Sequence, residues 1–271
     1  MQIVKACGFS THVETRWRSQ RECLQAASAE QRLEAQELAL ILGRRRARTT
    51  ILPVWHLPTQ MVFGVQTLVR GPAGGPLQRS RDLYRAARDL GRMGELDMLC
   101  VERALEASGL VSEQVAVFVR VSSSHLSRMA RTHESIDFLA CRCGCHPSRV
   151  VFEVNVDEMP EEEEHRVGSL MESLRKRGFR FAVDSFATGK SLSLLSTLPE
   201  PDFIKLPSVL VRGIDSDLAR RNLARGIIDV ASNCGAKLIA GNVERRQEEA
   251  ALRMLGASLF QGPLYGPGLT A

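Results

Sequence analysis

The chain has 271 residues, of which 44% are hydrophobic and 25% charged, as in an ordinary globular protein. Its net charge is +5, but the basic residues are scattered apart from the run at 43–48, so we expect no DNA or RNA partner. No segment approaches about eighteen uninterrupted apolar residues, and the first residues lack the apolar core of a signal peptide. We therefore expect no membrane partner and a cytoplasmic location, where the seven cysteines would remain thiols.

Residues 15–46 are polar and carry apolar side chains at roughly helical spacing, which predicts a helix. The pattern changes after this segment. We therefore divide the chain into a helical N-terminal extension at 1–48 and a main domain at 49–271.

In the main domain, short apolar runs alternate with amphipathic helical segments. The predicted strands are 49–55, 61–69, 115–122, 149–155, 179–184, 202–206, 237–241 and 257–262. The predicted helices include 80–93, 95–108, 162–178 and 217–235. Repeated strand–helix units favour a parallel sheet, and about eight strands fit a closed β/α barrel. The first two strands are too close for a crossover helix and predict an antiparallel hairpin, which makes the α/β barrel irregular.

Polar residues stand at the carboxyl ends of these strands, the end where β/α barrels carry their active sites. They are Gln66, Ser122, Glu153, Asp184 with Ser185, Lys205, Glu244 and Gln261. Carboxylates that lie close together at one end of a barrel repel each other, so they need a metal ion or a lysine ammonium group between them. The pattern favours a hard-metal or phosphate site, and the alternative is that each residue is a solvated strand end or a helix cap.

The order of these motifs resembles the EAL domain, the bacterial phosphodiesterase module that acts on cyclic di-GMP. The family motifs read EALLR, SVNLS, ExTE, DDFGTG, KID, AEGVE and QG. The corresponding stretches here are QTLVR (66–70), RVSSS (120–124), EVNV (153–156), DSFATG (184–189), KLP (205–207), AGNVE (240–244) and QG (261–262). The resemblance covers about residues 49–267 and implies an irregular TIM-like barrel with eight β/α units and one antiparallel strand.

The resemblance also implies that oxygen donors for a pair of metal ions have been replaced. Gln66 stands for the glutamate of EAL, Ser122 for an asparagine and Ser185 for the second aspartate of DDFGTG. The second glutamate of ExTE is Val156, and the first glutamate of AEGVE is Gly241. Such changes weaken metal sites, so we expect a degenerate domain that is not an enzyme, with no catalytic residue and no metal. Mg²⁺ or Mn²⁺ would be needed only for residual phosphodiesterase activity.

The function implied is a regulatory protein of bacterial cyclic di-GMP signalling that binds the nucleotide without hydrolysing it. The candidate ligand-binding residues are Leu68, Arg70, Glu153, Asp184, Lys205, Glu244 and Gln261. Leu52 and Pro207 depart from the family at positions normally held by glutamine and aspartate.

Two alternatives stay open. One is a barrel that regulates a protein partner, with its basic N-terminal helix as the contact. The other is a weak phosphodiesterase in which Asp157 or Glu158 replaces a lost ligand. The resemblance also allows a homodimer. The cluster CRCGCH at 141–146 suggests zinc or redox sensing, but its cysteine spacing is tight for one tetrahedral ion.

Overall fold

The strands close into a barrel, as the sequence predicts. A computed structural model describes residues 29–132, 140, 141, 143–184, 186, 189–194 and 197–270. The strands are β1 (Arg48–His56), β2 (Met61–Arg70), β3 (Ala116–Val121), β4 (Val150–Asn155), β5 (Arg180–Asp184), β6 (Phe203–Leu206), β7 (Lys237–Ala240), β8 (Leu259–Phe260) and β9 (Leu269–Thr270). Seven consecutive strands, β2 to β8, pair in parallel, and β1 closes the barrel by pairing antiparallel with both β2 and β8. The predicted hairpin is therefore confirmed.

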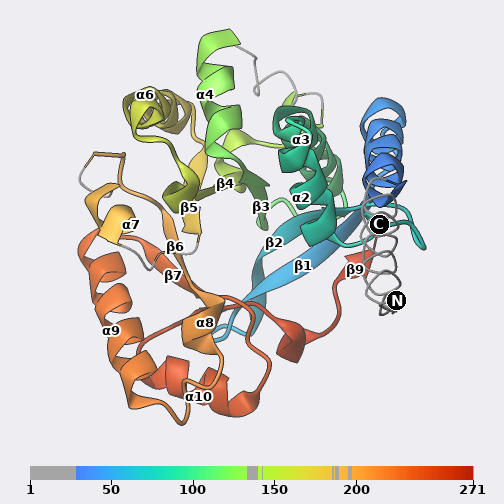
Figure 1. Cartoon of the computed structure of the whole chain (residues 1–271). Helices are drawn as coiled ribbons and strands as arrows, with labels where there is room; N and C mark the ends of the chain where they lie inside the picture. The colour runs from blue at the N-terminus through green and yellow to red at the C-terminus, as the bar shows by residue number, and fades with distance from the viewer. Residues whose placement is uncertain are drawn as a thin grey trace, which may run out of the picture.

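Helices surround this barrel (Figure 1). They are α2 (Ser80–Asp89), α3 (Met93–Ser108), α4 (Ser123–Thr132), α6 (Glu161–Lys176), α7 (Gly189–Leu194), α8 (Ser208–Val211), α9 (Leu218–Asn233) and α10 (Arg246–Met254). Short 3-10 turns lie at Pro147–Arg149, Val156–Glu158 and Pro263–Tyr265. The last predicted barrel strand is shorter than expected, because Ala257 still donates its N–H to Leu252 at the end of α10.

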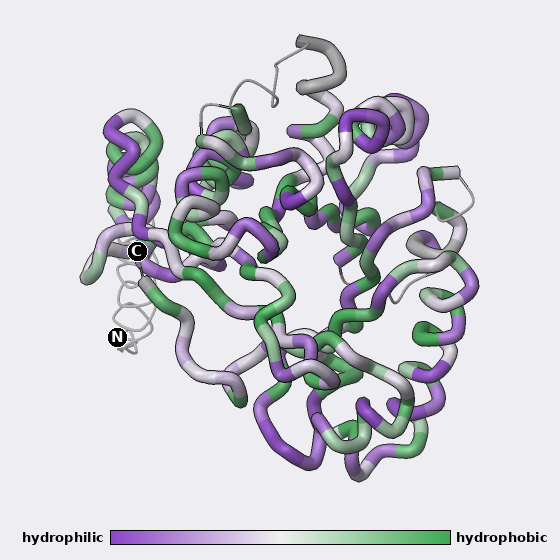
Figure 2. Tube along the Cα trace, turned by 180° about the vertical axis from the view of Figure 1, so that it is seen from behind, coloured by the Kyte–Doolittle hydropathy of each residue, from purple (hydrophilic) through white to green (hydrophobic). Residues whose placement is uncertain are grey.

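The barrel interior is filled by side chains, which confines any ligand site to its ends. One residue from most strands enters an inner cluster, which comprises Val54, Ala116, Phe118, Val151, Ala182, Phe203, Ile239 and Leu259. The rings of Phe118 and Phe203 meet edge to face across this interior, with centroids 5.2 Å apart. Alternate residues face the helices instead, and the apolar strand segments run through the middle of the molecule in Figure 2.

A helix over residues 29–44 packs on the side of the barrel and is drawn in blue in Figure 1. Leu38 and Ile41 are fully buried in the main core. Glu37 accepts a hydrogen bond of 2.9 Å from the N–H of Leu77, in the loop that follows β2. The predicted N-terminal helix is confirmed over 29–44, and its first part lies outside the described residues. The domain boundary at 48/49 stays a prediction.

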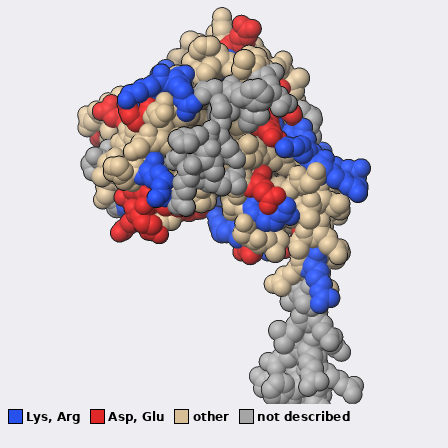
Figure 3. All heavy atoms as spheres, turned by 90° about the horizontal axis from the view of Figure 1, so that it is seen from above, with Lys and Arg blue, Asp and Glu red and all other residues tan. Residues whose placement is uncertain are grey.

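Charged side chains of both signs are interspersed on the face shown in Figure 3, so that face carries no broad patch of one sign. Within the described ranges, no helix has the length and apolar character needed to cross a membrane.

The burial of this helix predicts that Ile41→Ala destabilises the whole domain. The lost packing and the cavity should lower the free energy of unfolding by about 2–5 kcal/mol. Leu40→Ala is the matched control, because Leu40 is 49% exposed and should change stability by less than about 0.5 kcal/mol. Denaturant unfolding measures both. Equal stabilities of the two variants would show that the helix is an independent extension.

Candidate functional site

Four polar side chains from alternate strands form one layer at the carboxyl end of the barrel. Gln66 comes from β2, Glu153 from β4, Lys205 from β6, and Gln261 directly follows β8. Lys205 Nζ donates to Glu153 Oε1 at 2.8 Å and to Gln261 Oε1 at 3.4 Å. Gln66 Nε2 donates to the other oxygen of Glu153. Four side chains from alternate strands are the usual layer of a β/α barrel, so the fold itself brings these residues together.

The layer holds a buried ion pair. Glu153 is 1% exposed and the Lys205 side chain 8% exposed. Burial raises the pKa of the Glu153 carboxyl above its ordinary value, while the Lys205 ammonium opposes that rise. The hydrogen bonds from Lys205 and Gln66 also favour the charged carboxylate. Glu153 therefore depends on its neighbours to stay ionised.

A cavity of about 690 Å³ opens above this layer. It is lined by Leu52, Pro53, Gln66, Asp184, Lys205, Leu206, Pro207, Ser208, Gly241, Asn242, Gln261, Gly262, Pro263, Gly266, Pro267 and Gly268. Four of the predicted polar positions, from different strands, thus face one space of small-ligand size.

Asp184 lines this cavity from the end of β5, and its side chain is 20% exposed. The guanidinium of Arg120 lies 3.9 Å from its carboxylate. Next to this pair, the hydroxyl of Ser122 donates to Asp97, and the N–H of Ser122 donates to the same oxygen at 3.2 Å. Asp97 is fully buried in α3 and sets the orientation of the β3 end.

Sequence reasoning missed both Asp97 and Arg120. A signal for Asp97 was present, because an acid among the apolar residues of a buried helix needs a partner nearby. Arg120 gave no such signal, since its strand position alone does not show which acid it meets.

Like Glu153, three other candidate ligand-binding residues lie outside the cavity lining. Leu68 and Arg70 share a face of β2 with Gln66 but lie beyond it along the strand. Glu244 pairs with Arg212 at 2.8 Å, and its side chain is 44% exposed. Ser185 lies outside the described residues. The assignment of all seven ligand-binding residues stays a prediction.

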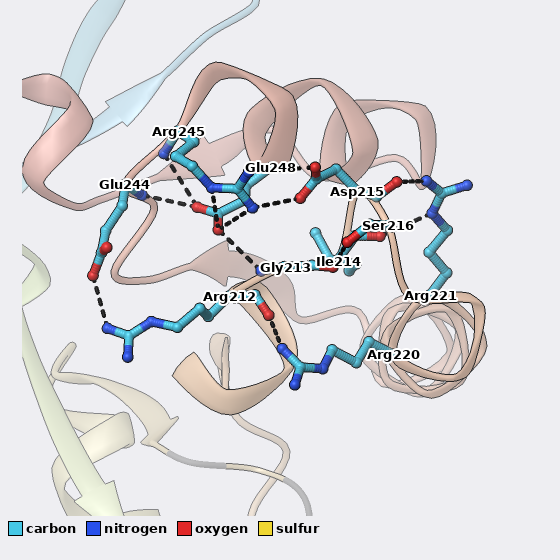
Figure 4. A network of polar contacts seen from close by, with 10 residues as sticks. All are labelled: Arg212, Gly213, Ile214, Asp215, Ser216, Arg220, Arg221, Glu244, Arg245 and Glu248. Carbon is cyan, nitrogen blue, oxygen red and sulfur yellow. Dashed lines mark hydrogen bonds and ion pairs between the residues drawn. The ribbon is translucent and has the colours of Figure 1, made fainter.

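Glu244 belongs to a polar network that ties the segment after α8 to the start of α10 (Figure 4). Its centre is Glu248, which is 1% exposed and accepts hydrogen bonds from the N–H groups of Gly213, Glu244 and Arg245. Burial alone would raise the pKa of the Glu248 carboxyl, but these hydrogen bonds outweigh it and hold the pKa below its ordinary value. The network therefore braces two loops at the carboxyl end of the barrel.

The family model of the EAL domain matches residues 35–267. This chain belongs to the EAL domain family. Its barrel is similar to the FimX EAL domain of Xanthomonas citri, solved in complex with cyclic di-GMP, with a TM-score of 0.78 and 18% identity over 90% of this chain and 96% of that one.

A second similar structure is BlrP1 of Klebsiella pneumoniae, solved as a manganese and cyclic di-GMP complex. It has a TM-score of 0.73 and 22% identity over 83% of this chain and 56% of that one. Among curated proteins, the cyclic di-GMP phosphodiesterase NbdA of Pseudomonas aeruginosa is 29% identical over 215 residues, which is 78% of this chain and 25% of NbdA. The matched part spans 16% to 34% of the first curated relatives.

Two predictions are corrected by these comparisons. The prediction that the chain is not an enzyme is contradicted by its similarity to a named phosphodiesterase. The prediction of no metal cofactor is contradicted by the manganese complex of a structural neighbour. Both predictions were wrong for the same physical reason, because they counted every replaced side chain as a lost metal ligand. Glu153 and Asp184 remain at neighbouring strand ends, and amide and hydroxyl oxygens are also ligands for hard cations.

The cysteine cluster spreads over different environments. Cys141 is exposed and Cys145 is buried. The imidazole of His146 is engaged locally, because its Nδ1 accepts from the N–H of Ser148 at 3.3 Å. Within the described residues, no three His, Cys, Asp or Glu side chains form a group suited to a metal ion.

The buried pair predicts that Lys205→Met is strongly destabilising in a pH-dependent way. At neutral pH the change leaves the Glu153 carboxylate buried without its cation, which should lower the free energy of unfolding by about 3–5 kcal/mol. Near pH 4 and below, the ordinary carboxyl range, Glu153 is protonated in the folded chain and most of the loss should disappear. As the pH rises through the raised pKa of Glu153, the carboxyl ionises and the difference in unfolding free energy between wild type and Lys205→Met should return.

Denaturant unfolding at neutral and acidic pH measures this effect. Lys176→Met is the control, because that lysine is 74% exposed and its pair with Glu172 lies at the surface. A loss for Lys205→Met that is the same at both pH values would contradict the role assigned to Glu153.

Proposed function

We propose that this EAL domain binds cyclic di-GMP in the cavity at the carboxyl end of its barrel. The observation that carries this proposal is the convergence of Gln66, Asp184, Lys205 and Gln261 on one cavity of about 690 Å³. The nucleotide is chosen because similar barrels were solved with it bound.

The cavity suits a nucleotide in chemical terms. The Lys205 ammonium can meet a phosphate oxygen, and the amides of Gln66 and Gln261 offer both donors and acceptors to a base or a ribose. Apolar lining from Leu52 and Pro263 can pack against the faces of the bases.

Hydrolysis of the bound nucleotide would need a divalent metal ion, and two carboxylates and two neutral oxygens remain near the carboxyl end of the barrel as donors for one. Glu153 and Asp184 would supply carboxylate ligands, and the Gln66 carbonyl and the Ser122 hydroxyl would supply neutral oxygens from neighbouring strand ends. A bound metal would lower the pKa of a water molecule and so supply the nucleophile. In the present structure Lys205 and Gln66 hold the Glu153 carboxylate in place. Arg120 lies beside Asp184.

Calorimetric titration with cyclic di-GMP, in Mn²⁺ and in a chelator, tests binding. Chromatography of the same samples for the linear dinucleotide tests cleavage. We expect saturable binding, and Lys205→Gln should weaken it about tenfold or more because a charge-assisted contact to phosphate is lost. No binding at near-millimolar nucleotide would reject the proposal and leave a protein partner as the alternative.

The metal assignment predicts that Gln66→Glu increases metal-dependent cleavage. The change restores a full negative charge where the cavity now has a neutral amide, and it should raise metal affinity or turnover about tenfold or more. Gln114→Glu is the control, because Gln114 is exposed and precedes β3. The rate of linear dinucleotide formation as a function of Mn²⁺ concentration measures the effect. An unchanged metal dependence would show that Gln66 does not face the metal.

A further inference from the structure

Two arginines, Arg48 and Arg70, are Cα partners at the open end of the β1–β2 hairpin. In the antiparallel register Leu52 lies opposite Gln66, Thr50 opposite Leu68, and Arg48 opposite Arg70. Residues two apart on a strand share a face, and the register is regular until the irregularity at Val54/Trp55. These three pairs therefore form one strip, which begins at the cavity lining with Leu52 and Gln66 and ends at the rim with the arginines.

This arrangement is unfavourable without an anion. Like charges directly opposite each other on antiparallel strands destabilise a sheet. Arg70 is half-buried, and its Nε is enclosed with no hydrogen-bond partner among the described residues. Arg48 is exposed and makes no ion pair within the described part of the chain. The neighbouring Arg45 differs, because it pairs with Glu102.

We infer that Arg48 is a further phosphate-binding residue: beside Arg70, which the family resemblance already implies as a ligand-binding residue, it forms a two-guanidinium clamp for a phosphate group at the rim of the cavity. Planar guanidinium groups bind phosphate oxygens through paired N–H donors, and two of them on one strip can hold both sides of a phosphodiester. The clamp lies four residues, roughly 13 Å, along the strand from Gln66. A cyclic dinucleotide has two phosphodiester groups, so one ligand can contact both the Lys205 layer and the rim. The identity of the ligand rests on the proposed function, and the clamp itself rests on the register.

Arg48→Ala, Arg48→Lys and Arg46→Ala test the inference. Arg46 is exposed, lies just before β1 and lacks an ion-pair partner in the described ranges, so its removal makes the same change in net charge. In calorimetric titration with cyclic di-GMP, Arg48→Ala should raise Kd about tenfold and Arg46→Ala less than about twofold. Arg48→Lys should fall between wild type and Arg48→Ala, because it keeps the charge and loses the paired donors.

A second experiment tests phosphate binding by the clamp without using the nucleotide. Pyrophosphate should raise the melting temperature of the wild-type protein, and the shift should be lost in Arg48→Ala and kept in Arg46→Ala. Without ligand, Arg48→Ala should melt at the same temperature as wild type or higher, because a repulsion is removed. This comparison shows that lost binding is not misfolding.

The outcomes separate the two proposals. If the wild-type protein binds cyclic di-GMP and Arg48→Ala binds it equally well, the clamp is wrong and the proposed function stands. If cyclic di-GMP does not bind but the pyrophosphate shift depends on Arg48, the clamp stands and the proposed function is wrong. If the pyrophosphate shift is absent from wild type or the same in all variants, the clamp is rejected.

Discussion

The pairing of β1 with both β2 and β8 is the constraint on which this molecule depends. A parallel sheet of seven strands would leave two open edges, with unpaired N–H and C=O groups on β2 and β8. One antiparallel strand satisfies both edges and closes the barrel. Closure also arranges the inward-facing side chains in layers, because those of alternate strands lie at the same level along the barrel axis. Gln66, Glu153, Lys205 and Gln261 meet for this reason, although they are far apart in the sequence.

The same closure places the open end of the hairpin at the carboxyl end of the barrel, beyond the cavity lining. β1 runs antiparallel to its neighbours, so its first residue, Arg48, lies at the carboxyl end of the barrel with the last residue of β2. In a regular β/α barrel the residues that begin a strand lie at the opposite end from the active site. Here one strand contributes its first residue to the carboxyl end, and the chain that leads into it comes directly from the helix at 29–44.

Much of the fold could be predicted from the sequence, because strand and helix periods are local signals. All eight predicted barrel strands and the hairpin are present, and the motif order led to the correct family. Side-chain partners were harder to predict, since they depend on register between distant strands. The Lys205–Glu153 pair follows from the layer, but the Asp97–Ser122 contact and the Arg48–Arg70 pair appear only once neighbours are known. The prediction that the chain is not an enzyme was wrong, because residue identities alone do not show which oxygen atoms a metal ion could still reach.

The balance of charge across the mouth connects these observations. Below the cavity, Glu153 forms an ion pair with Lys205. Asp184 lies beside Arg120, so each carboxylate is compensated by a cation of the chain itself. Gln66 and Ser122 add oxygens without adding negative charge. At the rim, Arg48 and Arg70 are cations without a described partner. Such a mouth attracts an anion more strongly than a free cation. A metal ion would therefore bind best together with the phosphate, because the phosphate supplies the negative charge that the replaced side chains do not.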